Sequence, residues 1–224
     1  MRTLILLAGE LCTDAWGVLP ELSGPWDCVI CADGGAYHAL RLGVVPDVVL
    51  GDFDSLAQDD IEHIGIASVI SFPTAKDKTD AHLAVDEALR RDSTEIVLAG
   101  ALGGRLDHTL ANIGLLRLLH RHGVKAVASD GRQTVYHVTD ELTLTGPPGR
   151  TVSVWPLTPE VRGLSLTGLR WSLDGVRLEL GDTRTISNEF VGGPAKIALE
   201  AGELLVIVTK SPPDKCHGDA TRLP

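Results

Sequence analysis

Two aspartates that stand two residues apart are the first candidates for chemistry. Asp52 and Asp54 flank Phe53 and follow the apolar run at residues 48–50. In an extended chain such positions project from the same face, roughly 7 Å apart. Two carboxylates this close repel each other unless a cation is bound, and oxygen ligands without His or Cys favour a hard ion such as Mg²⁺. The pair predicts a metal site, and the alternative interpretation is an acidic surface turn.

A second charged group opens the most regular helical pattern of the chain. Asp77 and Thr79 are natural helix N-caps, and Asp80 suits the first helical turn, so capping is one interpretation. Capping does not explain Lys76 and Lys78, because cations are disfavoured at a helix start. A site that binds polyphosphate through metal ions and ammonium groups needs charges of both signs, and this is the other interpretation.

Two glycine-rich segments could bring backbone amides close to a phosphate. They are Asp33, Gly34 and Gly35 in the first, and Gly103, Gly104 and Arg105, followed by Asp107 and His108, in the second. Glycine permits sharp turns, and Arg presents a planar fork to phosphate oxygens. The sequence has neither a Walker loop nor a Gly-x-Gly-x-x-Gly motif, so a nucleotide would be held in another way.

All these groups lie where short apolar runs end. Up to about residue 130 the sequence alternates such runs with helical patterns, which is typical of parallel strands joined by crossover helices. We expect a doubly wound, mainly parallel α/β sheet with flanking helices, whose ligands bind beyond the carboxyl ends of the strands. The predicted strands are residues 3–8, 28–32, 48–50, 68–72, 95–99 and 125–128, and the predicted helices are residues 36–42, 79–90 and 107–122.

Beyond residue 131 the pattern changes to short strands rich in Val, Thr and Leu, separated by Gly, Pro and Asp. This spacing is typical of an antiparallel β-sandwich. The predicted strands are residues 134–138, 142–144, 151–157, 176–180, 196–199 and 204–208. We therefore expect an α/β domain at 1–131, a β-sandwich domain at 132–210 and a disordered tail at 211–224.

The composition narrows the classes of partner. The 224 residues are 44% hydrophobic and carry a net charge of −10, which describes a globular chain that repels a phosphate backbone, so we expect no nucleic-acid partner. No apolar run approaches the roughly 18 residues that span a bilayer, so we expect no membrane segment. The four cysteines are few and show no disulfide framework, which fits a cytoplasmic protein.

The order of the motifs carries a further signal. They are residues 33–36, 46–47, 51–55, 76–80 and 103–112 in the first half, and residues 168–173 and 185–190 in the second. In this order they resemble the thiamine pyrophosphokinase family, and the resemblance covers essentially the whole chain except the tail. It implies that thiamine and ATP give thiamine diphosphate and AMP. It also implies a homodimer whose active sites combine the α/β domain of one subunit with the β-sandwich of the other.

The resemblance also implies roles for individual residues. The implied catalytic residues are Asp52, Asp54, Asp77, Asp80, Arg105 and Asp107, of which the first four bind Mg²⁺ and polyphosphate. The implied nucleotide-binding residues are Asp33, Gly34, Gly35, Lys76, Thr79, Gly103, Gly104 and Arg105. The implied thiamine-binding residues are Trp171, Ser187, Asn188 and Asp107. The general base stays open among Asp107, Asp77 and His108.

A tryptophan face suits thiamine, because it attracts flat rings and cations. A tryptophan on a sandwich strand is usually a core residue, which is the alternative interpretation of Trp171. Two other functions remain as alternatives: transfer of the same diphosphate to another hydroxymethyl acceptor such as a 6-hydroxymethylpterin, and a catalytically idle ligand sensor of the same fold. The self-repelling aspartates disfavour the idle sensor, because an unused site has no evident reason to keep them.

Overall fold

The computed structural model describes residues 1–13, 20–52, 68–73 and 77–210. Asp54, Lys76 and the tail at 211–224 therefore lie outside the described residues. The described chain divides into two compact units, with the division between Arg132 and Gln133. Within the described ranges, no helix is both long and apolar enough to cross a membrane.

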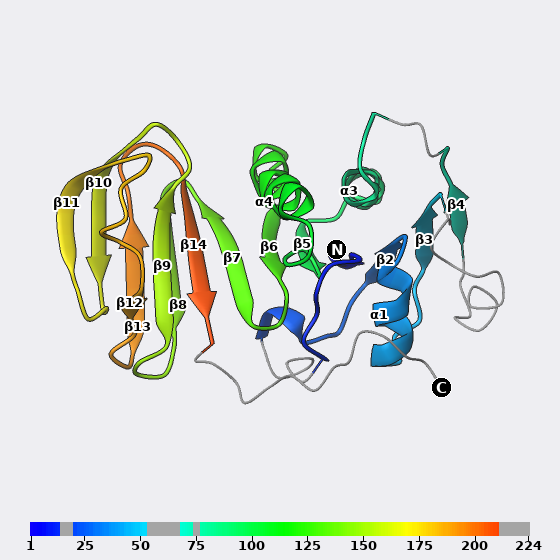
Figure 1. Cartoon of the computed structure of the whole chain (residues 1–224), viewed down its shortest axis with the longest axis horizontal. Coiled ribbons are helices and arrows are strands. Elements are labelled where there is room, and N and C mark those ends of the chain that lie inside the picture. Colours follow the sequence, from blue (N-terminus) through cyan, green and yellow to red (C-terminus); the bar gives the residue numbers. More distant parts are fainter. Residues whose placement is uncertain (14–19, 53–67, 74–76, 211–224) are drawn as a thin grey trace. The chain divides into compact units, whose positions relative to one another are not determined.

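The first unit contains six parallel strands in the order β6-β5-β1-β2-β3-β4 (Figure 1). Their bounds are Arg2–Leu6 for β1, Cys28–Ala32 for β2, Val48–Gly51 for β3, Val69–Ser71 for β4, Glu95–Ala99 for β5 and Lys125–Ser129 for β6. The chain runs outward from β1 to β4 and then returns to the other side of β1. The strand order thus reverses between β1 and β5, and open α/β sheets bind ligands at such a switch point.

The central strands β1, β2, β3 and β5 are buried on both faces, which explains their largely apolar composition. Alternate residues of β1 and β2, such as Leu4 and Cys31, share one core cluster with Ala36 of α1 (Gly35–Leu42). Ile5 and Ile30 point to the opposite face, because strand side chains alternate, and are also fully buried. Helix α3 (Asp80–Arg90) packs against β1, β2 and β3, and α4 (Leu106–Arg121) packs against β6.

The helix ends follow the chemistry that the sequence predicts. Thr79 is the N-cap of α3, and its Oγ1 accepts a hydrogen bond from the His82 backbone N–H at 3.2 Å. Gly123 follows α4 with a left-handed φ of 73°. All three predicted helices are confirmed, with their ends within one residue of the predicted bounds.

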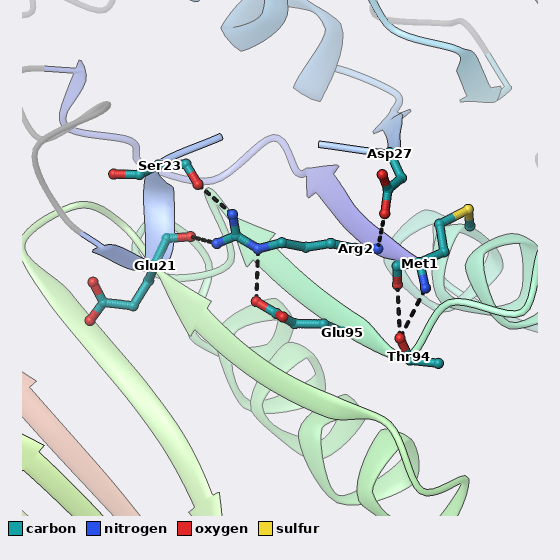
Figure 2. Close-up of polar contacts among 7 residues, drawn as sticks. All are labelled: Met1, Arg2, Glu21, Ser23, Asp27, Thr94 and Glu95. Atoms are coloured by element: carbon teal, nitrogen blue, oxygen red, sulfur yellow. Dashed lines mark hydrogen bonds and ion pairs between the residues drawn. The ribbon is translucent and has the colours of Figure 1, made fainter. Parts of the chain in front are cut away.

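The amino end of the same sheet is held by Arg2 (Figure 2). Its Nε donates to Glu95 at 2.7 Å, and its Nη1 donates to the carbonyl of Ser23 at 2.5 Å. The backbone N–H of Arg2 donates to the Asp27 carboxylate at 2.7 Å, and the guanidinium lies 4.1 Å from the centroid of the Trp26 ring. This network joins the starts of β1, β2 and β5 at the end of the sheet away from the switch point.

The second unit contains two antiparallel sheets, with the orders β12-β9-β14-β7 and β11-β10-β13-β8. The bounds are Gln133–Val138 for β7, Glu141–Thr145 for β8, Thr151–Pro156 for β9, Glu160–Thr167 for β10, Leu173–Glu179 for β11, Asn188–Glu189 for β12, Pro194–Ala198 for β13 and Leu204–Thr209 for β14. Buried residues from both sheets, such as Val206 and Ile197, form one core with Phe190. The predicted fold class, α/β followed by an antiparallel sandwich, is confirmed.

Two strands of this unit, β10 and β12, are absent from the sequence prediction. Strand β10 lies between β11 and β13, and its register with β11 shifts between Val161 and Leu164. Gly163 lies inside this shift with a left-handed φ of 66°. The bulge breaks the period-two pattern of buried residues that identifies a strand. Strand β12 has only two residues and gives no pattern at all.

Candidate active site

The loops after β1 and β5 are joined at the switch point. The backbone N–H of Gly9 donates to the Gly100 carbonyl at 2.9 Å, and that of Glu10 donates to the Leu102 carbonyl at 3.0 Å. A Cβ added to Gly9 would lie 2.4 Å from the Gly100 oxygen, and one added to Gly100 would lie 2.4 Å from the Leu7 oxygen. Only glycine permits this close approach of the two backbones. The loops after β1 and β5 are therefore held side by side at the carboxyl end of the sheet.

Gly9 and Glu10 are site residues that the sequence analysis missed. The side-chain carbons Cγ and Cδ of Glu10 lie 2.8 Å from the position of a Cβ at Gly103, so the Glu10 side chain lies directly over the glycine-rich loop. Glu10 is exposed and adds a carboxylate at the carboxyl end of β1. The one available signal is a glycine immediately after the first apolar run, the same signal that identifies the other loops.

The first predicted glycine-rich segment lies beside the end of β3, just before Asp52. The backbone N–H of Asp33 donates to the Leu50 carbonyl at 2.8 Å, and a Cβ on Gly51 would lie 3.2 Å from the Cα of Asp33. A Cβ on Gly35 would lie 2.0 Å from the Leu6 oxygen, so the first turn of α1 packs on the end of β1. Asp33, Gly34 and Gly35 thus lie beside the chain that leads into the partly buried Asp52.

Side chains of α4 hold the second glycine-rich segment in place. Nδ2 of the buried Asn112 donates to the Ala101 carbonyl at 2.9 Å, and Oγ1 of Thr109 donates to the Gly103 carbonyl at 3.2 Å. Gly103 and Gly104 both have left-handed φ angles, of 83° and 66°, and both are exposed. The loop therefore exposes its backbone to solvent, while hydrogen bonds from α4 hold the turn in place.

Arg105 and Asp107 form a bidentate ion pair at the start of α4. Nε of Arg105 lies 3.1 Å from Oδ1 of Asp107, and Nη2 lies 2.6 Å from Oδ2. The hydrogen bond from Arg105 lowers the pKa of the Asp107 carboxyl to about 2, with a smaller contribution from the backbone N–H of His108. Asp107 is therefore ionised at neutral pH and is a weak proton acceptor, which disfavours it as the general base.

At the start of α3 the capping role of Thr79 is confirmed. One of the two lysines, Lys78, forms an ion pair within this segment. Nζ of Lys78, which precedes the helix, lies 2.5 Å from Oδ2 of Asp86 in the second turn of α3. Asp77 is exposed just before the helix, and Asp80 is its partly buried first residue. Within the described part of the chain, no three His, Cys, Asp or Glu side chains gather where they could hold a metal ion. Asp54, the fourth predicted ligand, lies outside that part.

In the second unit the three predicted thiamine-binding residues lie together. The side chain of Trp171 is 54% exposed, so the core alternative for this residue is wrong. Oδ1 of Asn188 accepts from the Trp171 backbone N–H at 3.0 Å, and Nδ2 donates to the Trp171 carbonyl at 2.7 Å. Ser187 precedes Asn188, is exposed and has a left-handed φ of 61°.

The first unit carries glycine-rich loops and carboxylates near its switch point, and the second carries an exposed aromatic ring, surfaces suited to a two-domain enzyme that binds phosphates and a flat ring. Residues 20–128 match the model of the thiamin pyrophosphokinase catalytic domain, and residues 137–204 match that of the thiamin pyrophosphokinase vitamin B1 binding domain. The two models together match most of the chain. The chain belongs to the thiamin pyrophosphokinase family.

Individual relatives agree with this assignment. The chain is 29% identical to a thiamine pyrophosphokinase of Bacillus subtilis (strain 168) over 92% of its own length and 98% of the Bacillus protein. It is 26% identical to a thiamine pyrophosphokinase of Oryza sativa subsp. japonica over 71% and 70% of the two chains. The crystal structure of a thiamin pyrophosphokinase family protein from Enterococcus faecalis has a TM-score of 0.81 and 28% identity, and covers 95% of this chain and all of that one.

Proposed function

We propose that this chain transfers the diphosphate group of ATP to the hydroxyl group of thiamine and releases AMP. The observation that carries the proposal is that both halves of the chain match the two domain models of a single family. The glycine-rich loops at the switch point and the exposed Trp171 supply surfaces suited to the two substrates.

The ATP end of the proposal rests on the loops after β2 and β5. Gly103 and Gly104 are exposed beside the fork of Arg105, a combination suited to phosphate oxygens. Gly34 and Gly35 lead into the first turn of α1, where backbone N–H groups favour an anion. We assign nucleotide binding to these loops, together with Asp33, Thr79 and Lys76.

The donor chemistry of the proposed metal site fits Mg²⁺. Asp52, Asp77 and Asp80 offer only carboxylate oxygens, which are the ligands that this hard ion prefers. Asp52 lies at the carboxyl end of β3, and Asp80 begins the helix that packs on β3. The described carboxylates do not by themselves gather into a metal site, so we propose that Asp54 completes it and that Asp52, Asp54, Asp77 and Asp80 together would hold Mg²⁺, which when bound would neutralise charge on the phosphate oxygens.

The proposed reaction needs little covalent chemistry from the protein. The thiamine hydroxyl oxygen forms a bond to the β-phosphorus of ATP, the bond from that phosphorus to the bridging oxygen of AMP breaks, and the hydroxyl proton passes to a base. Arg105 stabilises charge on the transferred group. The low pKa of Asp107 disfavours it as the base, and Asp77 and His108 are the other candidates.

The thiamine end of the proposal rests on Trp171. A half-exposed indole face attracts a flat, partly cationic substrate by stacking and by its quadrupole. Ser187 and Asn188 lie beside it in the chain that pairs with the Trp171 segment. We further propose a cytoplasmic homodimer in which the first unit of one subunit and the second unit of the other form each site.

The test is to incubate the purified protein with ATP and Mg²⁺, with and without thiamine, and to separate AMP from ADP by chromatography. We expect AMP to form only when thiamine is present. A 6-hydroxymethylpterin replaces thiamine in a parallel reaction and should give no AMP. Formation of ADP, or of AMP without thiamine, would refute the proposal.

A further inference from the structure

Trp171 lies in a segment that regular secondary structure does not hold. It falls between the end of β10 at Thr167 and the start of β11 at Leu173, and its side chain is 54% exposed. An exposed side chain in a loop can adopt several rotamers, and each one that it loses on binding costs affinity. A stacking surface is effective only when it is held before the ligand arrives.

The backbone of Trp171 is held by the segment around β12. Leu169 and Phe190 form an antiparallel bridge, and the Arg170 N–H donates to the Glu189 carbonyl at 2.9 Å. Leu169 and Phe190 are both buried in the sandwich core, at 6% and 1% exposure. The bridge therefore ties the Trp171 segment to the hydrophobic core of the unit.

Asn188 extends this pairing with its side chain. It is 4% exposed, its Oδ1 accepts from the Trp171 N–H at 3.0 Å, and its Nδ2 donates to the Trp171 carbonyl at 2.7 Å. The amide thus makes the two hydrogen bonds that a facing strand residue would make with its backbone. Because Oδ1 and Nδ2 are both engaged in this way, Asn188 acts on a ligand through Trp171.

The ring of Trp171 makes a cation–π contact with the neighbouring Arg170. The guanidinium carbon of Arg170 lies 5.1 Å from the centroid of the Trp171 ring, within the range of a cation–π contact. Nη1 of Arg170 lies 2.8 Å from Oε2 of Glu189, which fixes the guanidinium and offsets its charge. The guanidinium thus lies over the indole, while the Trp171 side chain keeps 54% of its surface exposed and can stack with a flat ring.

We infer that Asn188 and the Arg170–Glu189 ion pair are positioning residues that hold Trp171 as a preformed platform for a flat heterocyclic substrate. The identity of that substrate as thiamine rests on the proposed function. The platform itself rests on the contacts of four residues within a single unit.

The test compares Arg170→Met, Glu189→Gln and Asn188→Asp with the control Arg162→Met. Arg162 is an exposed arginine of the same unit with an ion pair of its own, to Glu160 at 3.5 Å, and it lies outside the Trp171 segment. We expect the two ion-pair variants to raise the KM for thiamine about threefold to tenfold and to leave the KM for ATP unchanged, because they loosen only the platform. Arg170→Lys keeps a cation and should recover part of the loss.

A readout that needs no turnover accompanies the kinetics. A fixed indole gives a near-ultraviolet circular dichroism band, and we expect Arg170→Met and Asn188→Asp to weaken the part of the signal that Trp171→Phe removes. Unfolding midpoints of all variants identify any that fail to fold. If Arg170→Met or Asn188→Asp fails, the kinetics of Glu189→Gln alone test the inference. Kinetics and spectra of Arg170→Met that equal those of Arg162→Met would overturn the inference. A wild-type protein that makes no AMP would refute the proposed function, but the spectra would still test the platform.

Discussion

At the scale of single residues, one ion pair sets the electrostatics of the glycine-rich loop. Arg105 and Asp107 are both exposed and are two residues apart, yet they meet in bidentate geometry because the helix begins between them. Exposed pairs contribute little to stability. The pair therefore matters for chemistry, because it holds a guanidinium beside Gly104 and lowers the pKa of Asp107.

Arg105→Met should raise the pKa of Asp107 from about 2 toward its ordinary value of 3.8, because the largest cause of the shift is removed. Carboxyl carbon chemical shifts measured by NMR across an acid titration test this. Turnover should fall by about 10², the scale expected when a charge stabiliser is lost. Because Asp107 stays ionised at pH 7 in both proteins, that loss belongs to Arg105. An unchanged pKa would contradict the ion pair.

His38 gives a second prediction for one residue, in the pH dependence of stability. Its Nε2 lies 2.8 Å from the Gly9 carbonyl oxygen, and burial, with Arg41 nearby, lowers the pKa of His38 below 6.5. The unfolded chain therefore binds a proton more readily, and the unfolding free energy should fall as the pH drops below 6.5. His38→Gln, which keeps a donor, should make this fall smaller. Denaturant unfolding at pH 7.5 and 5.5 measures the difference, and equal falls would contradict it.

At the scale of elements, the site depends on how closely the loops after neighbouring strands approach. The apolar runs predict the strands of the first unit, because strands covered on both faces are mostly apolar. They do not predict that Gly9 meets Gly100 or that Asp33 has a left-handed φ of 44°. These features depend on contacts between chain segments that are far apart in sequence.

Gly100→Ala tests the close approach of the two loops. Its Cβ would lie 2.4 Å from a backbone oxygen at a left-handed φ of 71°, so we expect a loss of about 1–3 kcal/mol or more in the free energy of unfolding. Gly114→Ala is the control, because a Cβ there meets nothing within 4 Å. That change should stabilise α4 by up to about 1 kcal/mol. Chemical denaturation measures both, and equal effects would contradict the account.

Asn112→Ala tests how α4 supports the glycine-rich loop. The change leaves the Ala101 carbonyl without its side-chain donor, and we expect a loss of about 1–3 kcal/mol in the free energy of unfolding. The KM for ATP should rise more than the KM for thiamine, because the loosened loop is the proposed phosphate site. A matched rise in both KM values would place the effect on the fold as a whole.

At the scale of the whole molecule, the two units were predicted from sequence with unequal success. The change at residue 131 from crossover helices to short Val-rich strands predicts both architectures. The platform under Trp171 could not be predicted, because Asn188 lies 17 residues from the backbone that it binds. Strand β10 was not predicted for a similar reason. The bulge at Gly163 interrupts the alternation of buried residues, and it is recognisable as a bulge only from the pairing of β10 with β11.

The proposed sharing of active sites between subunits has its own test. Asp52→Asn and Trp171→Ala should each be nearly inactive alone. Coexpressed and randomly assorted, they should recover about one quarter of the wild-type activity, because each mixed dimer holds one intact site. Recovery near zero with dimers present would mean that each site belongs to a single subunit.

The central claim is that a diphosphate, and not a single phosphoryl group, passes from ATP to thiamine. Phosphorus-31 NMR of one reaction mixture follows every phosphate species at once. We predict that AMP and thiamine diphosphate appear together in equal amounts while ATP declines. The appearance of ADP with thiamine monophosphate, or of free phosphate alone, would contradict the account.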